Sequence, residues 1–145
     1  MAPLTPDNEP IFLDDIMAEQ EAAEDTIQTS RTYHLNFAQG RICRPIDGEP
    51  AIRQYIRKAL GTARDRYAIY DEDYGNELYD LLGATDTTDA LLESEIPRML
   101  REALIYDDRI ESVTINEINR QQDAVYVNLS VATVDGLFID EEVTL

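Results

Sequence analysis

Three adjacent residues have side chains that could take part in catalysis or binding: Asp107, Asp108 and Arg109. They lie within "LREALIYDDRIESVTI", residues 100–115, where an apolar pattern of helical spacing passes into the alternating pattern of a strand. Two carboxylates at a suitable separation are sufficient for glycoside hydrolysis. The same residues also fit an ordinary solvated turn, or a docking point for another protein.

Glycoside hydrolysis requires one acid whose pKa is raised by an apolar pocket. An arginine beside an acid lowers the pKa of that carboxyl instead. Most of the other acidic residues, of which the chain has 30 in all, fall on polar helix faces or in turns. We therefore expect solvated or ion-paired roles for them, and the sequence provides no positive evidence for an enzyme.

The remaining reactive side chains predict neither a cofactor nor a metal site. The single histidine, His34, alternates with Tyr33 and Leu35 in a strand pattern and has no partner triad, so we expect an ordinary surface histidine. The single cysteine, Cys43, excludes an intrachain disulfide and a cysteine-based zinc site, and we expect a buried structural thiol. The six glycines never form a phosphate-binding loop.

The elements that must position these residues are three helical patterns between two groups of strand patterns. Strands are predicted over residues 31–37 and 41–43, helices over 49–60, 76–83 and about 85–104, and further strands after residue 110. We expect Asn76 to cap the second helix. Pro97 predicts a kink in the third helix, or a restart with Ser94 as its cap.

The last part of the chain reads as a hairpin followed by a final strand. Val113 and Ile115 mark its first strand, residues 125–131 its second, and residues 119–123 a polar turn between them. This order predicts an α+β fold, in which a small antiparallel sheet is completed by N- and C-terminal strands and packs against about three central helices.

Charge divides the chain and limits its partners. The formal net charge of −18 disfavours nucleic acid and a membrane surface, because both bind clustered cations. Residues 1–30 hold eight acids and no Lys or Arg, so we predict an acidic N-terminal arm there, with a short helix over about 14–24, and a folded domain over 31–145. No apolar run reaches the length of a membrane span and no signal peptide is evident, so we expect a protein made in the cytoplasm.

Basic residues gather in the region 41–66, which has seven cations and three acids, a net of +4. The chain's own acids could neutralise this face. Alternatively, the patch could meet acidic segments of a neighbouring subunit, with charge setting orientation.

Three stretches match one family in order and spacing. The first is "NFAQGRICRPIDGEPAIRQYIRKALGTARDRYAIYDEDYG", which contains Arg66, Tyr74 and Gly75; the second is "REALIYDDRIESVTI"; the third is "VYVNLSVATVDG". Together, from about residue 33 to 143, they resemble the baseplate wedge protein, or sheath initiator, of contractile phage tails, a family shared with type VI secretion and other contractile injection systems. The family has Glu-Pro-Arg where this chain has Asp107, Asp108 and Arg109.

The resemblance implies a structural component of the tail baseplate in a virion, assembled in the host cytoplasm with six copies around a tube. It implies that the corner at Asp107, Asp108 and Arg109, with Arg66, Tyr74 and Gly75, docks on other wedge subunits near the hub. It also implies that the C-terminal sheet templates the first ring of sheath subunits through exchanged strands, a form of β-augmentation. The partners implied are wedge subunits, sheath protein, and tube or hub proteins.

Two other functions remain as alternatives from the residues alone. One is a tail-associated peptidoglycan hydrolase that uses paired carboxylates. The other is a free adaptor that binds a basic partner through its acidic arm.

Overall fold

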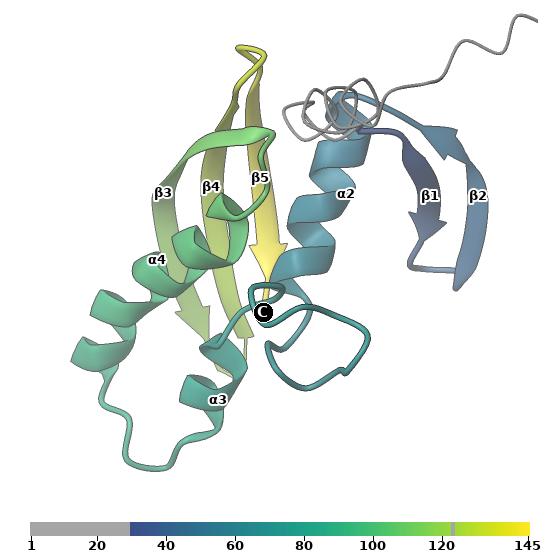
Figure 1. Ribbon diagram of the computed structural model, residues 1–145. Helices are drawn as coiled ribbons and strands as arrows, with labels where there is room; N and C mark the ends of the chain where they lie inside the picture. Colours follow the sequence, from purple (N-terminus) through teal and green to yellow (C-terminus); the bar gives the residue numbers. More distant parts are fainter. Residues whose placement is uncertain (1–29, 123) are drawn as a thin grey trace, which may run out of the picture.

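The computed structural model describes residues 30–122 and 124–145, and it confirms the α+β class with three helices among these residues (Figure 1). The elements in chain order are β1 Thr32–Asn36, β2 Arg41–Ile46, α2 Glu49–Leu60, α3 Leu78–Gly83, α4 Asp89–Ile105, β3 Ile110–Gln121, β4 Ala124–Thr133 and β5 Phe138–Thr144. The predicted acidic arm and its short helix fall almost wholly outside the described residues.

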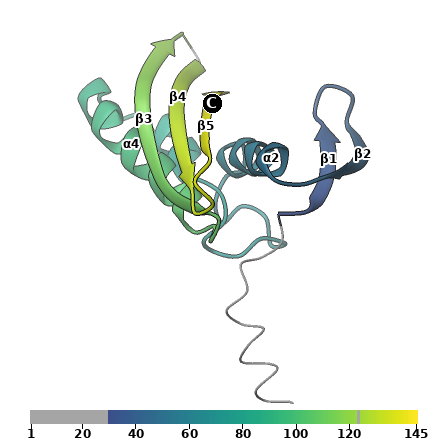
Figure 2. The same cartoon turned by 90° about the horizontal axis from the view of Figure 1, so that it is seen from above.

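The strands form two antiparallel sheets, so the prediction of one sheet completed from both ends of the chain is wrong in that detail. β1 pairs only with β2, and the second sheet has the order β3-β4-β5. Helix α2 lies between the β1–β2 hairpin and β5 (Figure 2). Only Asp47 and Gly48 separate β2 from α2, so the hairpin stays close to the helix. One face of α2 packs on the three-stranded sheet, and the hairpin lies on its opposite side.

One hydrophobic core joins the helices to one face of the three-stranded sheet. Helical spacing places Ile52, Ile56 and Leu60 of α2 on one buried stripe. The buried side chains of α4 are Leu92, Ile96, Leu100, Ala103 and Leu104, and the strands contribute Val125, Val127, Leu129, Val131 and Ile139. Because side chains alternate along each strand, the opposite face of the sheet is exposed and largely polar, with Tyr126 and Phe138 as its aromatic residues.

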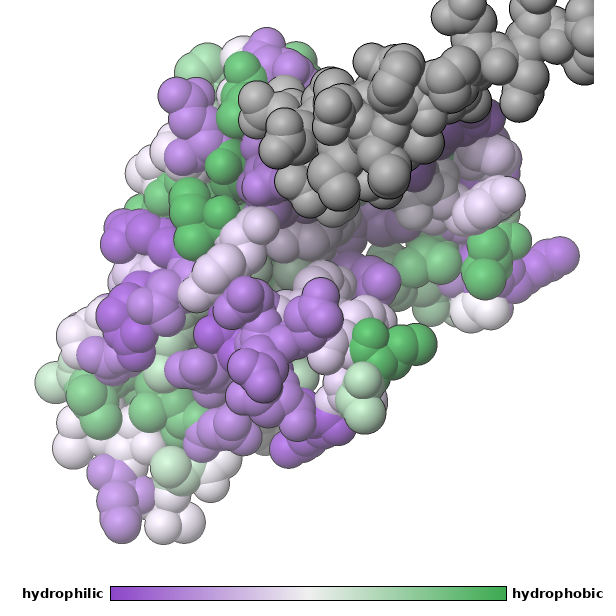
Figure 3. Space-filling view, viewed as in Figure 1, coloured by the Kyte–Doolittle hydropathy of each residue, from purple (hydrophilic) through white to green (hydrophobic). Residues whose placement is uncertain are grey.

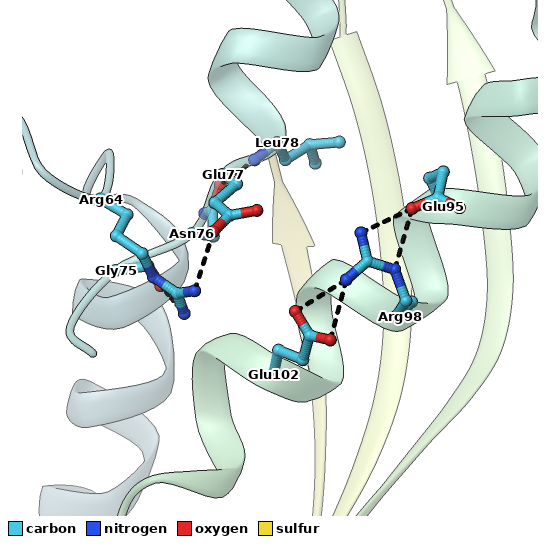
Figure 4. Close-up of polar contacts among 8 residues, drawn as sticks. All are labelled: Arg64, Gly75, Asn76, Glu77, Leu78, Glu95, Arg98 and Glu102. Atoms are coloured by element: carbon cyan, nitrogen blue, oxygen red, sulfur yellow. Dashed lines mark hydrogen bonds and ion pairs between the residues drawn. The ribbon is translucent and has the colours of Figure 1, made fainter. Parts of the chain in front are cut away.

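Helix α4 is continuous through Pro97, so the restart at Ser94 does not occur. The Thr88 hydroxyl caps the helix by accepting a hydrogen bond from Leu91 N at 3.3 Å. On the exposed face, Arg98 forms ion pairs with Glu95 at 2.6 Å and Glu102 at 2.8 Å (Figure 4). These pairs bridge the turns on both sides of the proline, which itself cannot donate a backbone hydrogen bond.

The hairpin between β3 and β4 is longer than the polar residues suggested. β3 continues to Gln121 and β4 begins at Ala124, so most of the predicted turn over 119–123 is strand. Asn119 and Gln121 face solvent while Ile118 packs against the core, which keeps the alternation of a half-buried strand. Gln122 has a φ of 50°, the left-handed conformation that a two-residue hairpin connection requires.

A buried carboxylate attaches α2 to β5. The side chain of Glu141 is 3% exposed and lies between two arginines of α2. Arg53 Nη1 donates to Glu141 Oε2 at 2.7 Å and to the Asp140 carbonyl at 2.7 Å, and Arg57 Nε donates to Glu141 Oε1. Arg53 also pairs with Glu49 at 2.8 Å. The basic residues of α2 are thus neutralised in part by the chain's own acids.

We expect Glu141→Gln to lower the free energy of unfolding by about 1–3 kcal/mol at pH 7, because it weakens two charge-assisted hydrogen bonds. Urea denaturation followed by circular dichroism measures the change. Glu142→Gln is the matched control on the exposed face, with an expected effect within about 0.5 kcal/mol. Equal losses for the two variants would contradict a stabilising role for this clamp.

Candidate docking site

The corner between α4 and β3 is a closed turn organised by Asp107. Asp107 N donates to the Leu104 carbonyl at 3.3 Å, and Ile110 N donates to the Asp107 carbonyl at 2.9 Å. The Asp107 carboxylate accepts hydrogen bonds from Arg109 N at 2.9 Å, Nε at 2.8 Å and Nη2 at 2.6 Å. Both side chains are largely buried, so this ion pair belongs to the fold of the corner.

The electrostatics of the corner favour the charged state of both partners. Burial alone would raise the pKa of the Asp107 carboxyl, but the hydrogen bonds from Arg109 outweigh it and hold that pKa below its ordinary value. The hydrogen bonds to Asp107 raise the pKa of Arg109. A lowered acid pKa means that the pair stabilises the fold above the pKa of the unfolded acid and loses this effect as the pH falls through the folded value.

The other face of Arg109 contacts α2 and the β4–β5 turn. Its guanidinium lies 5.4 Å from the ring centroid of Tyr55, and its carbonyl accepts a hydrogen bond from Val134 N at 3.0 Å. Burial and the nearby charge of Asp107 raise the pKa of Tyr55 to about 12. Arg109 therefore joins three parts of the fold and is not a free ligand for a partner.

Asp108 is the exposed residue of the corner. It forms no hydrogen bond or ion pair with the described residues. Tyr106, which ends α4, is 53% exposed beside it, and Val134 across the turn is 45% exposed. The family's proline position thus carries a free carboxylate with apolar neighbours.

Tyr74 connects the loop between α2 and α3 to the corner. Its ring stacks on Tyr70 at 4.4 Å between centroids and meets the edge of Tyr55 at 6.3 Å. Lys58 Nζ lies 5.2 Å and 5.7 Å from the ring centroids of Tyr70 and Tyr74. Burial raises the pKa of Tyr74. The aromatic group therefore packs against Tyr55, the side chain that Arg109 also contacts.

Gly75 allows two loop segments to approach each other. Its φ is +95°, and an added Cβ would lie 2.7 Å from the Thr62 carbonyl oxygen. The close approach permits Asn76 N to donate to the Thr62 carbonyl and Arg64 N to donate to the Asn76 carbonyl, both at 2.9 Å. Gly75 is therefore required by the fold.

Of the arginines in this loop, Arg64 has a largely buried side chain and Arg66 is exposed. Arg64 donates to the Gly75 carbonyl at 3.1 Å and pairs with Glu77 at 3.2 Å (Figure 4). Arg66 has no ion pair within the described residues. Asn76 Oδ1 accepts from Leu78 N at 3.0 Å, but Glu77 occupies the N-cap of α3, so the prediction that Asn76 caps this helix is wrong by one position.

Sequence reasoning missed Glu141 and misjudged Cys43. Glu141 interrupts the buried alternation of Ile139 and Val143, and this interruption was a readable signal of a paired buried acid. Cys43 is exposed, because the β1–β2 hairpin carries no layer over either face among the described residues. No sequence signal distinguished Arg64 from Arg66.

The outer edge of β5 offers unpaired backbone groups. Val125 and Leu145 exchange both backbone hydrogen bonds, at 2.9 and 3.0 Å, and the pairing register continues without a shift to Phe138. Odd-numbered residues of β5 therefore bond to β4, while the N–H and carbonyl groups of Phe138, Asp140, Glu142 and Thr144 point outward. Within residues 30–122 and 124–145, the sole bond to these groups is the one from Arg53 to Asp140.

A hollow of about 420 Å³ flanks the free end of this edge. Its walls come from β5, the C-terminal end of α2 and the tip of the β1–β2 hairpin, and they comprise Phe37, Arg57, Lys58, Gly61, Thr62, Glu142, Val143 and Thr144. Apolar surface is also visible over the hairpin in the space-filling view (Figure 3).

The corner offers poor geometry for hydrolysis. A hollow of about 330 Å³ is lined by Asp71, Asp73, Asp107 and Asp108 with three tyrosines. Asp107 has a lowered pKa and is held by Arg109, and the other three acids are exposed. Among the described residues, no cluster of His, Cys, Asp or Glu could hold a metal ion, and no helix is long and apolar enough to cross a membrane.

Comparison with known proteins agrees with the earlier resemblance. Residues 26–136 match the family described as contractile injection system sheath initiator. The chain is also 47% identical over 141 residues to the phage-like element PBSX protein XkdS of Bacillus subtilis (strain 168), which covers 97% of this chain and 95% of that protein. The chain therefore belongs to the sheath initiator family of contractile injection systems.

Proposed function

We propose that this sheath initiator starts the sheath by offering the outer edge of β5 to an extended arm of a sheath subunit. The observation that carries the proposal is the row of outward backbone groups at Glu142 and Thr144, next to an open hollow. An added strand would gain main-chain hydrogen bonds from the edge, and its alternate side chains would enter the hollow.

The regularity of β5 favours this edge over the outer edge of β3. β5 keeps one register with β4 along its full length. β3 has register shifts between Ile110 and Ser112 and between Ile115 and Glu117. Such irregularities bend a strand and hinder pairing at its edge.

Arg53 divides the β5 edge into a closed part and an open part. Its guanidinium occupies the Asp140 carbonyl, which a new strand would otherwise use. The free groups at Glu142 and Thr144 lie beyond it, toward Arg57 and Lys58. An arm with an acidic residue near its end would fit this location best.

The α4–β3 corner serves, in the same proposal, to dock the chain on neighbouring baseplate wedge subunits and on tube or hub proteins. The Asp107–Arg109 pair fixes the turn, and Asp108 and Tyr106 are its exposed contact groups. Arg66 extends this surface along the neighbouring loop, and Tyr74 supports that loop from within. Six copies around the tube of a virion would then present six strand edges.

The proposal predicts that Glu142→Pro blocks sheath assembly. Its N–H points away from β4, so proline removes a donor to the arm and none from the sheet. Electron microscopy of particles from cells that carry only this variant should show tubes and baseplates without sheath. Circular dichroism of the purified variant checks that it folds.

Two variants control this experiment. Glu142→Ala keeps the N–H and should give sheathed particles at the wild-type frequency. Arg120→Pro makes the equivalent change at an outward position of β3. Sheathless particles from Arg120→Pro together with normal particles from Glu142→Pro would show that the arm uses the other edge.

A second prediction distinguishes an exposed residue that contacts a partner from a buried residue that stabilises the corner. Asp108→Ala should change the free energy of unfolding by less than about 0.5 kcal/mol but reduce incorporation into baseplates, because its carboxylate is exposed. Asp107→Asn should cost about 1–3 kcal/mol at pH 7, a difference that shrinks as the pH falls below about 4, the pKa of the unfolded acid, and through the lower pKa of the native carboxyl. Urea denaturation at pH 7 and at acid pH measures the changes in the free energy of unfolding, and co-sedimentation with baseplates measures incorporation. Normal incorporation of Asp108→Ala would contradict direct docking there.

A further inference from the structure

A groove of about 410 Å³ separates the β1–β2 hairpin from α2. Its lining residues are Ser30, Arg31, Thr32, Tyr33, Leu35, Ile42, Ala51, Gln54, Tyr55, Lys58, Tyr74 and Arg109. The hairpin is held beside α2 by the Gln54 side chain, which accepts from Leu35 N at 2.7 Å and donates to the Tyr33 carbonyl at 2.8 Å.

The apolar face of the hairpin looks into this groove and remains uncovered by the described residues. Leu35 and Ile42 are cross-strand partners, so their side chains share one face with Tyr33. Tyr33 is 61% exposed and Ile42 is 74% exposed. A two-stranded sheet is marginal in water without packing on one face. An apolar occupant of the groove would therefore stabilise the hairpin.

The charge of the groove favours an acidic occupant. Its lining includes Arg31, Lys58 and Arg109 and no acidic residue, in a chain whose net charge is −18. Arg109 is already paired with Asp107, but Arg31 and Lys58 form no ion pair with the described residues. Arg31, which acts electrostatically on nearby Asp47, and Lys58, which lies over the rings of Tyr70 and Tyr74, can therefore still pair with carboxylates in the groove.

We propose that residues 11–17 of the same chain, "IFLDDIM", bind in this groove. The segment combines five apolar residues with Asp14 and Asp15, and residues 1–30 contain no cation that would oppose binding. Its composition matches both the apolar hairpin face and the two available cations.

The position of the groove on the chain makes this contact easy to reach. Ser30 and Arg31 line the groove, so the N-terminal segment leaves from its rim. Thirteen residues, 18–30, connect residue 17 to Arg31. They can span about 40 Å when extended, roughly twice the length of α2. A short tether also gives a high effective concentration, which favours this segment over a separate molecule.

A spin label on Cys43 tests the proposal in the full-length chain. Cys43 is the chain's single cysteine, lies on β2 and is exposed. We expect the label to broaden the amide NMR signals of residues 11–17. The double variant Arg31→Glu, Lys58→Glu should restore these signals, whereas Arg44→Glu, the same charge change on the hairpin outside the groove lining, should not.

Three results would overturn the proposal. The first is the absence of broadening at residues 11–17 in the labelled wild type. The second is broadening that persists in the double variant while the rest of its spectrum is native. The third comes from a mixture of spin-labelled chain without isotope enrichment and isotope-enriched chain without the label. If the broadening at residues 11–17 arises entirely between two such molecules, the groove binds the segment of a second molecule.

Discussion

The carboxylate of Glu141 and the two arginines of α2 that bind it fasten the helix to β5 at the border of the hydrophobic core. The clamp fixes α2 along β5, and this placement keeps the β1–β2 hairpin away from the three-stranded sheet. It also directs Arg53 onto the Asp140 carbonyl, so one interaction sets the position of the helix and the length of strand edge that stays free. Both candidate binding regions, the β5 edge and the groove, border the helix that this clamp holds in place.

Much of the fold was predictable because helical and alternating patterns report local burial directly. The sequence predicted α2, with Ile52, Ile56 and Leu60 on its buried stripe, and it predicted the strand pattern of β4. The separation into two sheets was not predictable, because it depends on which side of α2 the hairpin lies. The continuation of β3 through Asn119 was hidden by polar residues that face solvent in a strand as readily as in a turn.

The sequence predicted that Asp107 and Arg109 lie together at a corner between a helix and a strand, but it did not predict the structural role of each side chain. The Asp107–Arg109 contact followed from adjacent opposite charges, yet its inward orientation and its contact with Tyr55 come from tertiary packing. Gly75 is fixed by a close backbone approach. Asp107, Arg109, Tyr74 and Gly75 thus hold the corner and its neighbouring loop from within, while Asp108 and Arg66 are exposed. Residues of a family signature can therefore serve the fold as well as the surface.

The uniform register of β5 has a consequence for the accuracy of assembly. A strand that paired one residue out of step would place its apolar side chains on the solvent face and its polar ones against the hollow. Arg53, at one end of the free edge, binds the Asp140 carbonyl, so an added strand cannot use that group to pair in another alignment. An edge with few permitted alignments would act as a molecular ruler: each copy in a ring would set its sheath arm at the same height, and the first layer would begin without a step defect.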